Sequence, residues 1–185
     1  MDKNSRRIVT ISGDLGSGKS TVARMLAQKL GWQYYSTGMA QREIAIKMGV
    51  TTVELNQLAL SDKSIDQMID AVFQNPPWGR KPCVVDSRLA FHFLPRSFKV
   101  CLTVKPEVAA QRILNDQTRT GERKYKTLKQ ALIACQKRRK LELSRFIENY
   151  NLDITNPDNF DYVLDTSELS PLQTCNRILK ALKQS

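Results

Sequence analysis

The sequence contains a single histidine, His92, and its four cysteines form no pair with the C-x-x-C spacing. Structural zinc sites and dithiol redox centres are built from closely spaced cysteines and histidines, so this sequence excludes the usual forms of both. We therefore expect no structural metal. We expect the cysteines to be reduced residues within apolar packing, and they are Cys83, Cys101, Cys135 and Cys175.

Long apolar runs are also absent. No stretch approaches the roughly 18 apolar residues that a membrane-spanning helix needs. Residues 1–7 are mostly polar and lead into a short apolar segment without the hydrophobic centre of a signal peptide. We therefore expect a cytoplasmic protein with no membrane partner. A chain of 185 residues suits one domain, 1–185, with a full hydrophobic core, and we expect it to be a monomer.

The sequence has fewer acidic than basic residues. It contains 18 Asp and Glu and 29 Lys and Arg, which gives a net charge of +11. Such a surplus attracts polyanions, either nucleotides or nucleic acid. Much of it falls in residues 119–129 and 137–145. Because no RNA-recognition, zinc-finger or helix-turn-helix pattern is present, and no aromatics alternate with the basic residues, nucleic acid is not the expected partner.

One glycine-rich stretch carries the most specific signal in the chain, a match to G-x-x-x-x-G-K-[ST]. Its glycines let the backbone turn with positive φ, so that successive amide N–H groups converge on one anion. The lysine adds a mobile positive charge, and the following hydroxyl could bind the Mg²⁺ that accompanies a nucleoside triphosphate. The residues are Gly13, Asp14, Leu15, Gly16, Ser17, Gly18, Lys19 and Ser20, followed by Thr21.

The context of this loop supports the phosphate-binding interpretation. A β-branched apolar run precedes it at residues 8–12, and a helical stripe of Val22, Leu26 and Leu30 follows and stops at Gly31. Further strand patterns alternate with helical patterns, which predicts an α/β fold with a parallel sheet covered on both faces, in three layers. The five expected strands are residues 8–12, 33–35, 81–86, 98–104 and 162–165.

Ligands of such sheets lie beyond the carboxyl ends of the strands, where the strand order reverses. That edge is predicted to gather the phosphate loop with residues 36–38, 86–88 and 103–105. Arg42 and Arg88 each stand shortly after a strand end. Because guanidinium groups bind phosphates through two hydrogen bonds and stay charged, we expect both to hold an anionic acceptor.

A phosphate acceptor is already ionised near neutral pH and needs no general base. This agrees with a chain whose one histidine lies in an aromatic stretch, 91–93, where a packed role is expected.

Catalysis would instead depend on neutralising the moving phosphoryl group with Lys19, Mg²⁺ and arginines. The polar, basic segment 115–127 is a candidate lid that carries Arg119 and Arg123. Arg112 and Arg138, on the flanking helices, are alternatives.

At these residues the chain resembles the P-loop nucleoside monophosphate kinases, and among them the small cytidylate kinase-like proteins. The likeness covers nearly the whole chain. It rests on the phosphate loop and on four further stretches, which are residues 35–38 followed by Arg42, residues 85–90, residues 145–153 and residues 160–167.

The resemblance implies a P-loop NTPase fold, with a helical insertion at 36–80 for the nucleoside monophosphate and a lid at 115–127. It implies transfer of the γ-phosphoryl group of MgATP to a pyrimidine nucleoside monophosphate, most often CMP or dCMP. The implied site comprises ATP on the phosphate loop with Thr166 close to the adenine, Mg²⁺ at Ser20 and Asp86, and the acceptor at Ser36, Gly38, Arg42, Asp86 and Arg88.

Two positions depart from that family's pattern. Met39 stands where an acidic residue usually follows the glycine, and Asp116 stands where a lid arginine is expected. Two alternatives therefore stay open. One is a small-metabolite kinase on the same fold, with Asp86 as the base. The other is a basic nucleotide-dependent binding protein without transfer activity.

Overall fold

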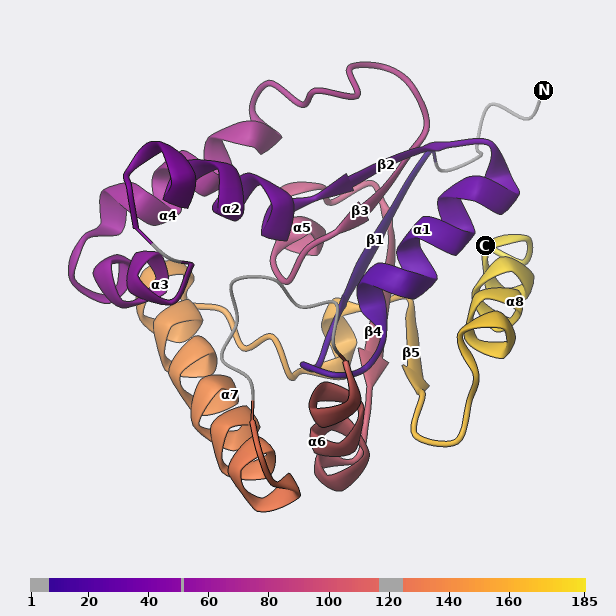
Figure 1. Ribbon diagram of the computed structural model, residues 1–185. Helices are drawn as coiled ribbons and strands as arrows, with labels where there is room; N and C mark the ends of the chain where they lie inside the picture. The colour runs from indigo at the N-terminus through magenta and orange to yellow at the C-terminus, as the bar shows by residue number, and fades with distance from the viewer. Residues whose placement is uncertain (1–6, 51, 117–124) are drawn as a thin grey trace.

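The computed structural model describes residues 7–50, 52–116 and 125–185 (Figure 1). Every predicted strand is present, and each pairs with its neighbours in parallel. The strand order is β2-β3-β1-β4-β5. This confirms the predicted α/β fold with a five-stranded parallel sheet. The strands are β1 (Ile8–Gly13), β2 (Gln33–Ser36), β3 (Cys83–Asp86), β4 (Phe98–Thr103) and β5 (Tyr162–Asp165).

The helices begin and end largely where capping residues occur. Gly31 adopts a left-handed conformation, with φ of 65°, and ends α1. Asp62 caps α4, and a capping box of Ser170 and Gln173 opens α8. The helices are α1 (Lys19–Leu30), α2 (Thr37–Lys47), α3 (Thr52–Ser61), α4 (Lys63–Asp70), α5 (Ala90–Phe93), α6 (Pro106–Asn115), α7 (Leu128–Tyr150) and α8 (Pro171–Leu182), with 3₁₀ turns at Ala71–Phe73 and Pro157–Asn159.

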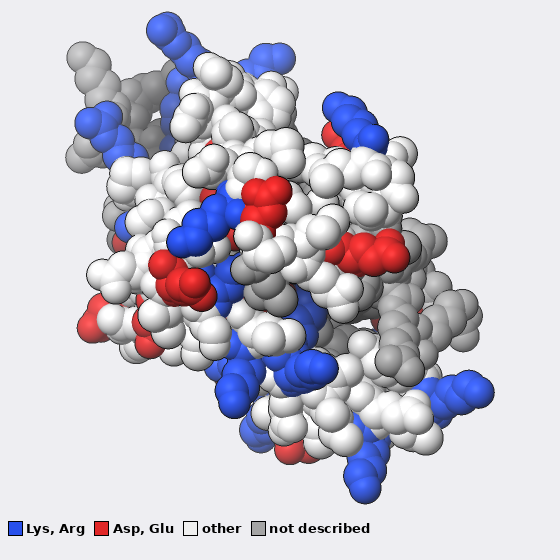
Figure 2. Space-filling view, turned by 90° about the vertical axis from the view of Figure 1, so that its left-hand side faces the viewer, with Lys and Arg blue, Asp and Glu red and all other residues white. Residues whose placement is uncertain are grey.

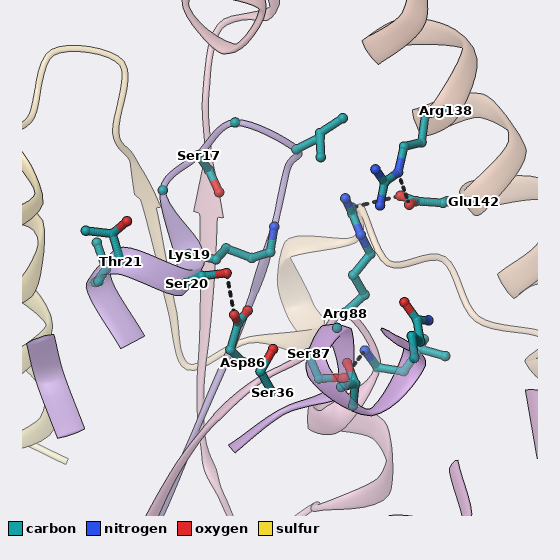
Figure 3. Close-up of a pocket in the computed structure, with 18 of the residues that line it drawn as sticks. Ser17, Lys19, Ser20, Thr21, Ser36, Asp86, Ser87, Arg88, Arg138 and Glu142 are labelled. Carbon is teal, nitrogen blue, oxygen red and sulfur yellow. Dashed lines mark hydrogen bonds and ion pairs between the residues drawn. The ribbon is translucent and has the colours of Figure 1, made fainter. Parts of the chain in front are cut away.

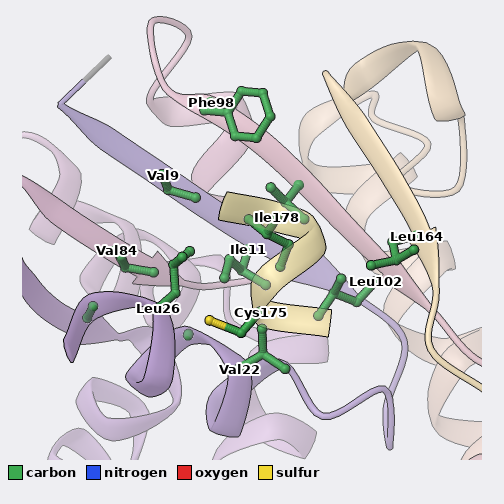
Figure 4. Packing of buried hydrophobic residues seen from close by; sticks show 13 residues of the cluster. Val9, Ile11, Val22, Leu26, Val84, Phe98, Leu102, Leu164, Cys175 and Ile178 are labelled. Atoms are coloured by element: carbon green, nitrogen blue, oxygen red, sulfur yellow. The ribbon is translucent and has the colours of Figure 1, made fainter. Parts of the chain in front are cut away.

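The main hydrophobic core lies between the sheet and the pair α1 and α8, which cover one face together (Figures 1 and 4). Val9 and Ile11 of β1 point into it, and so does Val84 of β3. Alternate residues of β3 face the opposite side, where Cys83 and Val85 pack against Trp78 and Ala90. Burial on both faces explains why these strands read as continuous apolar runs.

The cysteines behave as the sequence predicted, because all four are buried and carry free thiols. Within the described residues, no helix combines the length and the hydropathy that crossing a bilayer requires.

Helices α2, α3 and α4 form a unit of their own beside the sheet, at the left of Figure 1. Its small core joins the three helices through Ala45, Leu55, Ala59, Ile65 and Ile69. The unit occupies most of the predicted insertion, 36–80. Its core is separate from the main core.

The first strand approaches β4 so closely at Gly13 that no side chain fits there. Gly13 has φ of 134°, and an added Cβ would lie 2.0 Å from the carbonyl oxygen of Leu102. Gly49 also has positive φ, 69°, but an added Cβ would meet no described atom within 4 Å. A side chain would therefore be strained by the positive φ at both positions, but it would meet neighbouring atoms only at Gly13.

We expect Gly13→Ala to lower the free energy of unfolding by at least about 2 kcal/mol more than Gly49→Ala, because only the first adds a steric clash. Urea denaturation without nucleotide measures both changes. Equal losses would contradict the close approach of the two strands.

Candidate active site

A large cleft, with a volume of about 830 Å³, lies where the phosphate loop, the helical unit and α7 meet. Figure 2 shows this side of the molecule, where Lys and Arg side chains gather on the surface beside acidic ones. The cleft is lined by the loop from Leu15 onward, by residues 36–38 and by residues 86–89. The predicted contribution of residues 103–105 is wrong. Thr103 instead accepts hydrogen bonds from Thr166 and lines a smaller cavity.

The phosphate loop curls around the backbone carbonyl of Asp14. That oxygen accepts hydrogen bonds from the hydroxyl of Ser17 at 2.8 Å and from Nζ of Lys19 at 2.9 Å. Gly16 and Gly18 hold positive φ, 80° and 86°. Helix α1 begins directly after Gly18, and no described side chain caps its first turn. The amides of that turn therefore line the cleft as an anion-binding site.

Lys19 lines the cleft, and both arginines and carboxylates lie near its ammonium group. Burial, and after it the charge of Arg88, lower its pKa to about 8, while the carboxylates of Asp86 and Glu142 oppose this shift. The protonated lysine is therefore incompletely compensated in the protein alone. A polyphosphate bound in the loop would supply the missing negative charge.

Ser20, which follows β1, and Asp86, at the end of the neighbouring strand β3, meet in the cleft (Figure 3). The hydroxyl of Ser20 donates to Oδ2 of Asp86 at 2.6 Å, and Tyr34 donates to the same oxygen at 3.3 Å. A hydroxyl and a carboxylate are suitable ligands for Mg²⁺, which also keeps waters and binds phosphate oxygens. The described residues hold no cluster of three or more His, Cys, Asp or Glu for a metal.

Arg88 and Arg138 share one carboxylate, that of Glu142 on α7 (Figure 3). Nη1 of Arg88 lies 3.0 Å from Oε2, and Nε of Arg138 lies 2.9 Å from Oε1. Burial alone would raise the pKa of Glu142, but the two arginines outweigh it and hold that pKa below its usual value. Glu142 therefore orders two cations at the edge of the phosphate loop. The sequence reasoning missed it, since an Arg and a Glu four residues apart also occur on solvated helix faces.

The other predicted site residues divide into those that line the cleft and those that support it. Ser36, Gly38, Arg42 and Thr166 line it with the residues above. The hydroxyl of Thr166 also donates to the carbonyl oxygen of Ser17 at 3.1 Å, and this hydrogen bond stabilises the conformation of the phosphate loop.

Arg112 braces the same loop, since it donates to the carbonyl oxygens of Gly16 and Thr166. Gly13 and Asp14 do not line the cleft. They border a smaller cavity of about 70 Å³, where the carboxylate of Asp14 pairs with Arg139 at 3.1 Å.

The catalytic arginines predicted for the lid, Arg119 and Arg123, lie outside the described residues, and their roles stay a prediction. Asp116 lines the cleft. Met39 is 44% exposed and does not line it. His92 is exposed, which corrects the expected packed role. Its ring meets those of Phe93 and Tyr150 outside the cleft.

The chain is similar to known proteins over most of its length. The chain matches the family described as an AAA domain over residues 9–133. A cytidylate kinase from Natronomonas pharaonis is 36% identical over 166 residues, which cover 89% of this chain and 83% of that protein. A cytidylate kinase from Methanothrix thermoacetophila is 32% identical over 176 residues, covering 95% and 98%. An S-adenosylmethionine-dependent nucleotide dehydratase from Lacinutrix mariniflava is 32% identical over 178 residues. That match covers 96% of this chain, which spans only 36% of the dehydratase.

Solved structures share the fold. A shikimate kinase from Acinetobacter baumannii in complex with shikimate aligns with a TM-score of 0.62 and 20% identity, covering 98% of this chain and 95% of that one. An uncharacterized protein from Eubacterium ventriosum aligns with a TM-score of 0.69 and 17% identity, covering 96% and 99%. The parallel sheet and the phosphate loop thus define a P-loop kinase. Within that class the chain belongs to the cytidylate kinase-like family of nucleoside monophosphate kinases.

The lowered pKa of Lys19 predicts how stability depends on pH. Between pH 8 and the ordinary value of 10.5, the unfolded chain holds this proton more tightly than the folded one. We therefore expect Lys19→Met to raise the free energy of unfolding without nucleotide, most at pH 8 and below. The gain should fade as the pH approaches 10.5. With saturating MgATP, the wild-type protein should instead have the higher free energy of unfolding. Lys29→Met, on the exposed side of α1, should show neither effect. If the gain in the free energy of unfolding of Lys19→Met does not change with pH, it does not come from the lowered pKa of Lys19.

Glu142 gives a second prediction. Removing one partner of a buried ion pair costs about 3 kcal/mol, because the remaining charges lose their compensation. Glu142→Gln should therefore lower the free energy of unfolding by about that amount. Glu148→Gln, at an exposed position of the same helix, should leave it nearly unchanged. Thermal and urea denaturation measure the free energy of unfolding of both variants. Similar small losses would show that the ion pairs of Glu142 do not stabilise the folded protein.

Proposed function

We propose that this nucleoside monophosphate kinase transfers the γ-phosphoryl group of MgATP to CMP or dCMP and so forms the diphosphate. One observation carries the proposal. The same cleft is lined by a phosphate loop at the uncapped start of α1 and by two arginines, Arg42 and Arg88, that follow neighbouring strands. The cytidylate kinases at 32% and 36% identity support the choice of acceptor.

The donor would occupy the phosphate loop. The amides of residues 15–21 and the Lys19 ammonium group would hold the β- and γ-phosphates, and Thr166 would lie near the adenine. Ser20 and Asp86 would hold Mg²⁺, which supplies charge neutralisation of the phosphates when bound. Because Ser20 and Asp86 are already 2.6 Å apart, little rearrangement is needed to bring both to one ion.

The acceptor phosphate would lie between Arg42 and Arg88, with Ser36 and Gly38 beside it. Arg88 is suited to this role because Glu142 and the carbonyl oxygen of Gly13 fix its guanidinium group. Arg88 would then contact both the bound anion and the carboxylate of Glu142. The acceptor oxygen carries its own negative charge near neutral pH, so the reaction asks for placement and charge neutralisation and needs no base.

Charge on the moving phosphoryl group would be neutralised by Lys19 and by arginines. Arg138 is held at the cleft by Glu142, and Arg119 and Arg123 would join it from the lid at 115–127. Closure of such a lid would exclude water, which competes with the acceptor for the phosphoryl group. The monomeric state and the cytoplasmic location stay predictions.

The alternative acceptor, a hydroxyl of a small metabolite, would need a general base. Asp86 was the candidate, but its Oδ2 already accepts hydrogen bonds from Ser20 and Tyr34. Against a binding protein without transfer activity stands the similarity to cytidylate kinases over most of the chain. We therefore favour phosphoryl transfer to a monophosphate.

Purified protein with MgATP should convert CMP to CDP faster than it hydrolyses ATP. A panel of CMP, dCMP, UMP, AMP and small hydroxyl acceptors tests the acceptor class. Lys19→Ala should lower kcat by at least about 100-fold, because it removes a charge that stabilises the transition state. Lys29→Ala serves as the control. Failure to phosphorylate any monophosphate would refute the proposed function, and full activity of Lys19→Ala would refute the role of the lysine.

A further inference from the structure

The turn of α7 that carries Glu142 also contacts the first residues of the phosphate loop. Glu142 reaches the loop through Arg88, whose Nη1 donates to the carbonyl oxygen of Gly13 at 3.2 Å. Arg139, on the same turn, reaches it directly, since its Nη1 lies 3.1 Å from Oδ1 of Asp14. Two consecutive loop residues are therefore linked to one turn of this helix. The proposed phosphate chemistry uses the first contact and leaves the second without a role.

Asp14 connects three elements at this point. Its carbonyl oxygen accepts hydrogen bonds from Ser17 and Lys19 within the phosphate loop. Its Oδ2 accepts one at 3.2 Å from the amide of Val104, which follows β4, and its Oδ1 pairs with Arg139. Because these hydrogen bonds fix Asp14 to the loop and to the end of β4, its remaining oxygen can set the position of α7 relative to both.

The packing beneath this turn of α7 is incomplete. The smaller cavity, of about 70 Å³, lies between α7 and strands β1, β4 and β5. It is lined by Asp14 of the loop, Arg139 and Leu143 of α7, Cys101 of β4 and Val163 of β5. Closely packed side chains hold neighbouring elements in place, and a cavity removes contacts that would do so. The position of α7 over the loop therefore depends on the ion pairs more than on apolar packing.

The position of α7 matters because the helix carries Arg138 at the cleft. Nε of Arg138 lies 2.9 Å from Oε1 of Glu142 on the same helix (Figure 3), so its guanidinium group moves with α7. A misplacement of about 1 Å at a reacting group can lower a rate by about 100-fold. Neither Asp14 nor Arg139 lines the cleft, so both would act through the position of the helix.

We propose that Asp14 and Arg139 form a positioning pair, which sets the place of α7 on the phosphate loop and so holds Arg138 at the transferring phosphoryl group. This inference rests on the proposed function, in which Arg138 neutralises charge on that group. The side chain of Arg139 is 52% exposed and that of Asp14 is 19% exposed. Because exposed ion pairs contribute little to stability, the pair serves the rate of transfer more than the stability of the fold.

The test is a double-mutant cycle on kcat, with CMP as acceptor and MgATP as donor. Asp14→Asn removes one charge and keeps an oxygen for the amide of Val104, and Arg139→Gln removes the other charge. We expect each to lower kcat by about tenfold, with little change in either KM or in the melting temperature. The double variant should stay within about twofold of each single variant, whereas independent effects would multiply to about 100-fold.

Two further variants sharpen the test. Arg139→Lys should recover most of the rate, because a lysine can also donate one charged hydrogen bond to Asp14. Lys140→Gln is the matched control, since Lys140 is an exposed neighbour on α7 that lines neither the cleft nor the smaller cavity. Its kcat should stay unchanged.

The other outcomes separate this inference from the proposed function. If Arg139→Gln lowers kcat and Asp14→Asn does not, or if their effects multiply, the two residues do not act as a pair and the inference is overturned. A higher KM for ATP in Asp14→Asn alone would also overturn it, because Asp14 would then shape the loop by itself.

Unchanged kcat in both single variants overturns the inference, while the proposed function stands. A wild type that phosphorylates no monophosphate contradicts both. If Asp14→Asn fails to fold, the comparison of Arg139→Gln with Arg139→Lys decides. Equal kcat values of these two variants would overturn the pairing.

Discussion

The structure is organised around a concentration of positive charge that the protein itself compensates only in part. Lys19, Arg88 and Arg138 meet at the phosphate loop, where Glu142 is the carboxylate that contacts both arginines. The positive end of the α1 dipole adds to them. Charges held this way destabilise the folded chain until an anion arrives. A bound polyphosphate would compensate these charges. The free energy that they cost the folded protein would then contribute to the affinity for the anion.

The parallel sheet keeps these groups in register. Because β1 and β3 pair in parallel, Ser20 after the first strand and Asp86 at the end of the third come within hydrogen-bond distance. The phosphate loop is then fixed from the other side by Arg112 and Thr166, which bind its carbonyl oxygens. The loop is therefore braced before any ligand binds, and its amides need little rearrangement to bind one.

Sequence patterns predicted the strands, the phosphate loop and the family, because each depends on local periodicity or on fixed spacing along the chain. They missed Glu142, since an acidic residue on a polar helix face gives no sign of which element packs against it. The expectation that residues 103–105 line the cleft failed for a related reason. Strand topology fixes which ends lie together, but not that Thr103 would be covered by Thr166.

The most direct test of the central claim is the number of protons exchanged when MgATP binds near pH 8. Calorimetry in buffers of different ionisation enthalpy measures it. If burial and the neighbouring Arg88 lower the pKa of Lys19 to about 8, binding of the polyphosphate raises it again, and about half a proton is taken up at that pH. Lys19→Met should abolish the uptake. Binding without proton uptake in the wild-type protein would contradict the account.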